Sequence, residues 1–128
     1  MGKQVIGGAT ILPGGARLPF SKAIRAGDFV FVSGQVPFGP DGKVVQGGIE
    51  VQTRQVMENI KAILADAGCT MDDIVKCTAW LGDPRDFALF NQVYGSYFDD
   101  APPARSCVAS MLMIDAKVEV EAIAYKPL

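Results

Sequence analysis

Hydrophobic residues recur along the chain with two spacings, and the change from one to the other separates strands from helices. Between residues 49 and 67 they return every three or four positions, which is the period of an α-helix with one buried face. The members of this stripe are Val56, Met57, Ile60, Ile63, Leu64 and Ala67. Gly68 follows, and glycine best tolerates the left-handed conformation that ends many helices. The pattern predicts a helix over residues 49–67.

A second helix is predicted to begin at Asp83-Pro84, with Asp83 as the N-cap and Pro84 at the first helical position. Aromatic residues follow at helical spacing, namely Phe87, Phe90, Tyr94 and Tyr97. Such a stripe indicates a face packed against the core. We expect Pro102-Pro103 to end this element, because proline cannot continue a helix.

The other apolar segments have the length and alternation of β-strands. They are residues 23–26 and 29–32 joined at Gly27-Asp28, a short segment at Val44-Val45, residues 74–81, residues 104–111 and residues 117–125. The strand over 74–81 is expected to place on one face Val75, Cys77, Ala79 and Leu81. The last two strands are expected to turn around residues 114–116. The Gly- and Pro-rich stretch over 7–19 is predicted to be a surface loop.

The predicted order is therefore β-β-β-α-β-α-β-β, an α+β fold with a mostly antiparallel sheet and two helices on one face. Two helices cover only one face of so wide a sheet. The other face would leave a large apolar patch in water. We therefore expect the chain to form an oligomer through the uncovered face.

Composition narrows the possible chemistry. The 128 residues, with a mass of 13.6 kDa, correspond to one domain over residues 1–128. The chain has no histidine, which excludes a Ser-His-Asp triad, a Cys-His pair and histidine metal ligands. Cys69, Cys77 and Cys107 lack the spacing of a zinc site, and we interpret them as buried thiols in a reducing compartment.

Charge and hydropathy exclude further classes. A net charge of -2 and a pI near 5.0 argue against a nucleic-acid partner, because such proteins usually carry a basic surface. No apolar run reaches the roughly 20 residues of a membrane span, and no secretory signal begins the chain. We expect a cytoplasmic protein without a membrane partner.

Two strands carry the candidate catalytic and ligand-binding residues. Arg105 and Cys107 share one face of the strand over 104–111, where the guanidinium either binds a carboxylate or phosphate or makes a structural ion pair. Glu119 and Glu121 share a face of the last strand. They are either solvated charges or, if that face meets another subunit, candidates for general acid/base catalysis. Asn91 is compatible with a plain surface position on the second helix.

Several segments together resemble one family. They are Phe31-Val32-Ser33-Gly34-Gln35-Val36-Pro37, Gln52-Thr53-Arg54-Gln55 with Asn59-Ile60, Asp86-Phe87 with Asn91 and Tyr94, Pro103-Ala104-Arg105-Ser106-Cys107-Val108, and Val118-Glu119-Val120-Glu121-Ala122-Ile123-Ala124. The chain resembles the reactive intermediate deaminase family, RidA type, also known as YjgF or L-PSP proteins. The resemblance implies a chorismate-mutase-like α+β fold and a homotrimer whose sheets line a central barrel, with three clefts between subunits.

The resemblance also implies an activity, the hydrolysis of 2-imino or enamine acids such as 2-iminopropanoate and 2-iminobutanoate to 2-keto acids and ammonia. Arg105 matches the family arginine that holds the substrate carboxylate, and Glu119 matches the carboxylate that positions or activates water. The matching cleft residues are Ser33, Gly34, Asn91 and Cys107. The resemblance implies neither a metal nor an organic cofactor, and its ligand is a small 2-imino or 2-keto carboxylate between subunits.

Two positions depart from the family pattern. Phe20 stands where a cleft tyrosine is often found, which removes one hydroxyl, and the segment over 111–114 lacks the usual Leu-Pro. A non-catalytic trimer that senses small carboxylates through Arg105 is therefore kept as an alternative function. A ribonuclease or translation inhibitor, the activity attached to the L-PSP name, is less favoured because the chain is acidic and lacks histidine.

Overall fold

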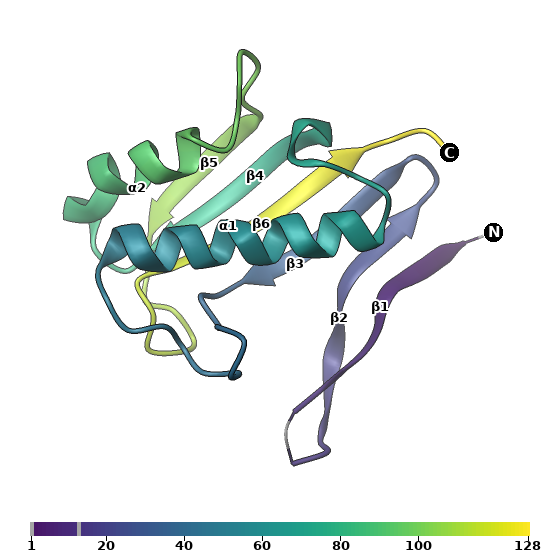
Figure 1. Cartoon of the computed structure of the whole chain (residues 1–128), viewed down its shortest axis with the longest axis horizontal. Coiled ribbons are helices and arrows are strands. Elements are labelled where there is room, and N and C mark those ends of the chain that lie inside the picture. Colours follow the sequence, from purple (N-terminus) through teal and green to yellow (C-terminus); the bar gives the residue numbers. More distant parts are fainter. Residues whose placement is uncertain (1, 13) are drawn as a thin grey trace.

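The structure, a computed structural model, describes residues 2–12 and 14–128, which form a six-stranded sheet with two α-helices on one face (Figure 1). The elements are β1 (Lys3–Ile11), β2 (Arg17–Ala26), β3 (Phe29–Gln35), α1 (Ile49–Asp66), β4 (Ile74–Leu81), α2 (Phe87–Gly95), β5 (Ala104–Ala109) and β6 (Val118–Tyr125). Short 3₁₀ helices precede β4 and α2, at Met71–Asp73 and Pro84–Asp86. The predicted α+β class and the position of the helices are confirmed.

The strand order across the sheet is β1-β2-β3-β6-β4-β5, with β4 and β5 parallel and the other described pairs antiparallel. The last strand, β6, therefore lies between β3 and β4, and β5 forms an edge. The last two strands, β5 and β6, are consecutive in the sequence, as expected. They are not neighbours in the sheet, because β4 lies between them. The helix α2 connects β4 to β5, and a parallel pair requires such a crossover.

The predicted loop over residues 7–19 is wrong, because β1 and the first part of β2 occupy most of it. Gly7 and Gly8 have positive φ angles of 82° and 74°, and the β1–β2 register shifts between Ile6 and Ala9. Glycines can therefore form a bulge within a strand as well as a loop between strands. The hairpin extends away from the body of the sheet (Figure 1).

The short strand expected at Val44-Val45 is also wrong. Val44 makes a single bridge with Phe38, and the segment lies outside the sheet. The side chain of Gln52 holds it, since Nε2 donates to the Val45 carbonyl oxygen at 3.1 Å. The Val45 N–H also donates to the Pro37 carbonyl oxygen at 2.9 Å, so the segment closes a small hairpin outside the sheet. The strands predicted over 23–26 and 29–32 are confirmed as parts of β2 and β3, and the unpredicted β1 takes the place of the third predicted strand in the count.

The first helix agrees with the prediction to within one residue. Its buried side chains pack on β3 and β6, and Gly68 follows with a φ of 75°. The core between helices and sheet includes Val30, Val56, Ile60, Phe90, Val118 and Val120. Along β4, Cys77, Ala79 and Leu81 share the buried face as predicted. Val75 is exposed and Ile74 is buried instead, because the register shifts between Ile74 and Lys76.

The second helix begins as predicted and ends earlier. The Asp83 carboxylate accepts a hydrogen bond from the Arg85 backbone N–H at 2.9 Å, which confirms the N-cap. The helix α2 ends at Gly95, well before Pro102-Pro103. Beyond it the backbone makes tighter bonds to the third residue back, such as Phe98 N–H to the Gly95 carbonyl at 3.1 Å. Glycine has low helix propensity, which favours an end at this position.

The face of the sheet away from the helices carries large apolar side chains beside the carboxylates of β6, and no described element covers it. Its large exposed side chains are Val5, Phe29, Phe31, Val108 and Tyr125. Phe29 lies against Tyr125, with 5.2 Å between ring centroids, and against Phe31 at 6.3 Å. The expected apolar second face is therefore present, and we call it the outer face.

Arg25 connects three parts of the chain from a buried position, with 7% of its surface exposed. Its guanidinium donates to the carbonyl oxygens of Lys126 and Ala67, at 3.0 Å each, and of Gly27 at 3.4 Å. The Ala67 carbonyl belongs to the C-terminal end of α1, where a positive charge is favourable. Arg25 thus joins the helix end, the β2–β3 turn and the residues after β6.

We expect Arg25→Ala to lower the free energy of unfolding by about 2–3 kcal/mol, because three partly buried hydrogen bonds from one charged donor are lost. Urea unfolding at fixed protein concentration measures the change. Lys61→Ala, at an exposed position on α1, is the control and should stay within about 0.5 kcal/mol of the parent. An unfolding free energy for Arg25→Ala equal to that of the control would contradict the assigned role.

Candidate functional site

Arg105 lies on the helix side of the sheet. Its register partner on β4 is Cys77, which is fully buried under the helices. The guanidinium carbon, Cζ, lies 4.9 Å from the ring centroid of Tyr94, 5.5 Å from that of Phe90 and 5.6 Å from that of Phe87. Such cation–π contacts favour the charged group and restrict its orientation. We call these three rings the aromatic cage.

Asn91 completes the surroundings of Arg105. Its Oδ1 accepts a hydrogen bond from Arg105 Nη1 at 2.7 Å. Among residues 2–12 and 14–128 no carboxylate pairs with Arg105, so a structural ion pair within the chain does not explain this residue. Rings and a neutral amide hold the guanidinium without neutralising its charge. That arrangement leaves the positive charge available to an anion.

Cys107 lies on the same face of β5, two residues beyond Arg105, and is partly buried. Burial raises the pKa of its thiol, and the nearby Arg105 charge only partly opposes this. The thiol is therefore protonated at neutral pH, and a thiolate is the nucleophilic form of cysteine. Cys107 can line a site, but its surroundings do not activate it as a nucleophile.

Glu119 lies on the outer face of β6, because its neighbours Val118 and Val120 point into the core. Gly34 approaches it so closely that a Cβ on Gly34 would overlap a Glu119 carboxylate oxygen. Burial raises the pKa of Glu119, and the negative charge of Glu121 raises it further. A partly desolvated carboxylate with a raised pKa is suited to accept and return protons near neutral pH.

Phe20 and Ser33 line a groove of about 400 Å³ formed by β1, β2 and β3. Ser33 Oγ donates to the Ser21 carbonyl oxygen at 2.5 Å, which fixes this hydroxyl at the end of β3. The groove, which we call the hairpin groove, also has Lys3, Thr10 and Arg17 in its lining. Sequence analysis missed these three residues, because it placed two of them in a loop.

The predicted site residues therefore form two groups on opposite sides of the sheet. Arg105, Asn91 and Cys107 lie on the helix side, while Glu119 lies on the outer face with Gly34 against it. The two groups project from opposite faces, so the backbone of the sheet lies between them. Within one chain, Arg105 and Glu119 cannot act on the same small molecule.

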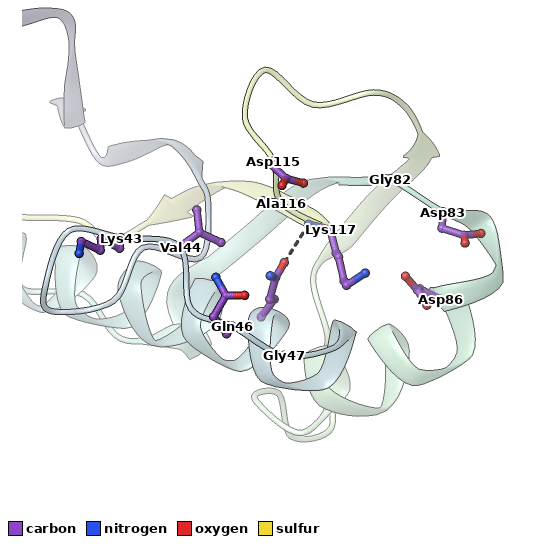
Figure 2. A pocket seen from close by; sticks show the side chains of 11 residues that line it. Lys43, Val44, Gln46, Gly47, Gly82, Asp83, Asp86, Asp115, Ala116 and Lys117 are labelled. Carbon is purple, nitrogen blue, oxygen red and sulfur yellow. Dashed lines mark hydrogen bonds between the residues drawn. The ribbon is translucent and has the colours of Figure 1, made fainter.

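A cavity of about 670 Å³ lies elsewhere, at the end of the sheet near the start of α1 (Figure 2). Its polar lining residues include Lys43, Gln52, Asp83, Asp86, Asp115 and Lys117. Gln52 is already satisfied, since its Oε1 accepts from the Lys117 backbone N–H at 2.8 Å and its Nε2 is bonded as described above. Hydrogen bonds from Arg85 lower the pKa of Asp83 to about 2. None of the predicted site residues lines this cavity.

Among residues 2–12 and 14–128, no cluster of three or more Cys, Asp or Glu side chains is arranged to hold a metal ion. Neither described helix has the length and apolar character needed to cross a membrane.

Comparison with known proteins identifies the family. Residues 13–126 match the family described as Endoribonuclease L-PSP. A RutC family protein of Pyrococcus horikoshii is 52% identical over 110 residues, which span 84% of this chain and 87% of the relative. The crystal structure of E. coli TdcF with bound serine is similar at a TM-score of 0.84 and 38% identity, covering 96% of this chain and 98% of TdcF. The crystal structure of RidA from an Antarctic Psychrobacter is similar at a TM-score of 0.84 and 35% identity. This match covers 95% of the present chain and 98% of the Psychrobacter protein.

The match extends over nearly the whole chain and includes both groups of site residues. The resemblance drawn from the sequence is therefore confirmed, and the chain belongs to the L-PSP family, also called the YjgF/RidA family.

Proposed function

We propose that this protein hydrolyses reactive 2-imino acids, such as 2-iminopropanoate and 2-iminobutanoate, to 2-keto acids and ammonia in clefts between the subunits of a homotrimer. One observation carries the proposal: Arg105 and Glu119 lie on opposite sides of one sheet. A second copy that packs on the apolar outer face would bring its own Arg105 toward Glu119 of the first. The association would also remove the outer face from water.

In this cleft Arg105 holds the substrate carboxylate. Its planar fork matches the two oxygens of a carboxylate, and the aromatic cage and Asn91 orient it before the ligand arrives. Preorganisation reduces the entropy lost when the substrate binds. Cys107 and the backbone beside Gly34 line the cleft around the reacting carbon.

Glu119 transfers the protons. It takes one proton from water as the water oxygen bonds to the C=N carbon, and the π electrons move to nitrogen, which then receives that proton from Glu119. In the carbinolamine that results, Glu119 takes the hydroxyl proton and returns it to nitrogen as the C–N bond breaks and the C=O bond forms. Both protons of water thus leave with ammonia. The raised pKa of Glu119 suits this exchange.

Two other functions remain to be compared. The first is a trimer that binds small carboxylates through the same Arg105 without turning them over. The serine bound in the crystal structure of TdcF, a similar protein, supports a ligand of this class. An endoribonuclease is suggested by the family description. The net charge of -2 and the absence of histidine disfavour it, because RNA binding relies on positive charge and RNA cleavage usually relies on histidine.

Mixed oligomers test whether two chains build each cleft. Arg105→Ala and Glu119→Gln should each be inactive alone, whereas co-expressed subunits should recover about a quarter of parental activity, because random cyclic assembly unites the two intact residues in that share of clefts. The measurement is keto-acid release from freshly generated 2-iminobutanoate, with light scattering to establish the trimer. A mass near one chain, or no recovery in intact mixed trimers, would contradict the two-chain cleft.

Arg105→Lys should lose most activity although it keeps the charge, because lysine cannot make the bidentate contact or stack in the aromatic cage. We expect kcat/KM for 2-iminobutanoate to fall by about tenfold or more, mainly through KM. The control is Arg54→Lys on the exposed face of α1, which should match the parent. Near-full activity in Arg105→Lys would mean that Arg105 supplies only diffuse charge.

Glu119 and Glu121 should differ, because residues two apart on a strand are about 6.6 Å apart and cannot both reach one water. Glu119→Gln should lower kcat by about a hundredfold. Glu121→Gln should retain turnover and shift the acid limb of the kcat/KM profile to lower pH, because loss of its negative charge lowers the pKa of Glu119. The reverse pattern in intact trimers would assign catalysis to Glu121.

A further inference from the structure

The hairpin groove has an uneven distribution of charge. Among the described residues that line it, Lys3 and Arg17 are the charged ones, and no carboxylate belongs to its lining. The chain as a whole carries a net charge of -2, so this local positive character opposes the overall charge. Glu119 and Glu121 lie on β6, two strands away from β2, and do not line the groove. An anion in the groove would therefore meet cations without facing a lining carboxylate.

A second observation points to a missing polar partner in the same place. Thr10 lines the groove, and its Oγ1 is buried without a hydrogen-bond partner among residues 2–12 and 14–128. Buried hydroxyl groups are normally satisfied, because an unmade hydrogen bond is costly. Ser33, by contrast, already donates to Ser21. The hydroxyl of Thr10 is thus an unpartnered donor beside a groove with two cations.

The groove shares two residues with the predicted site. Phe20 and Ser33, both predicted to contact substrate, are in its lining together with Arg17. Arg17 and Phe20 lie on the same strand, about 10 Å apart along it at the usual strand rise. An arginine side chain and the side chain of a five-carbon substrate together can bridge that separation. Phe20 offers an apolar surface between the two ends.

We infer that the hairpin groove is the subsite for the substrate side chain and that it selects an acidic one, so the preferred substrates are 2-imino dicarboxylates. This inference rests on the proposed function. Arg105 of one subunit holds the carboxylate next to the imine. Arg17 of the neighbouring subunit binds the distal carboxylate with its planar fork, the hydroxyl of Thr10 donates to it, and Lys3 adds a favourable field. The methylene groups between the two carboxylates lie along Phe20.

The test compares two substrates that differ in the distal carboxylate, 2-iminoglutarate and 2-iminopentanoate, each generated in the assay by an amino-acid oxidase. At low ionic strength we expect kcat/KM for 2-iminoglutarate to exceed that for 2-iminopentanoate by about tenfold. A hydrogen bond between Arg17 and the distal carboxylate is expected to strengthen binding by about this factor. Arg17→Gln should reduce the ratio to near one, through a loss of kcat/KM for 2-iminoglutarate. Lys22→Gln, on the same strand but outside the groove lining, is the matched control and should keep the ratio.

Calorimetric binding of the products, 2-oxoglutarate and 2-oxopentanoate, separates this inference from the proposed function. Tighter binding of 2-oxoglutarate that depends on Arg17 supports the subsite even if neither imine is hydrolysed, an outcome that would overturn the proposed function alone. Hydrolysis of 2-iminopentanoate without any preference for the dicarboxylate, or a preference that survives Arg17→Gln, overturns the subsite and leaves the deaminase proposal standing.

Discussion

The alternation of side chains along β6 determines where everything else in the molecule can act. Val118, Val120 and the two alanines that follow are fully buried beneath α1, so each residue between them must point the other way. Because the period of a strand is two, a slip of one residue would place Glu119 in the core and a valine in the site. The free energy of burying the small apolar set therefore fixes the position of the carboxylate.

A second constraint concerns how Arg105 keeps its charge. Proteins often stabilise a partly buried guanidinium with a carboxylate, which would reduce its attraction for a further anion. Here the same task falls to three aromatic rings and the amide oxygen of Asn91. The quadrupole of the rings stabilises a cation without adding a negative charge to compete with the ligand. The aromatic stripe of α2 thus has a function in addition to packing.

Local periodicity predicted the helices well, because a helix is built from contacts three and four residues apart. The N-cap at Asp83 and the glycine after α1 were equally local signals. Sequence reasoning failed where the outcome depends on distant partners. The glycines near Ile6 form a bulge in a strand, because the strand pairs with β2. Similarly, β6 pairs with β3 and β4, not with β5, the strand before it in the sequence. The resemblance suggested the residues Arg105 and Glu119, but only the sheet shows that they lie on opposite sides.

The central place of β6 also governs the order in which the chain can fold. As the last strand to be synthesised, it must insert between β3 and β4, which are already made and separated by α1. Until it does so, the two halves of the sheet have no shared hydrogen bonds, and the apolar side of α1 lacks its main support. Contacts between residues so far apart in sequence form slowly. On the ribosome, the core therefore closes only after β6 has emerged, and until then the edges of β3 and β4 that it will join are unpaired.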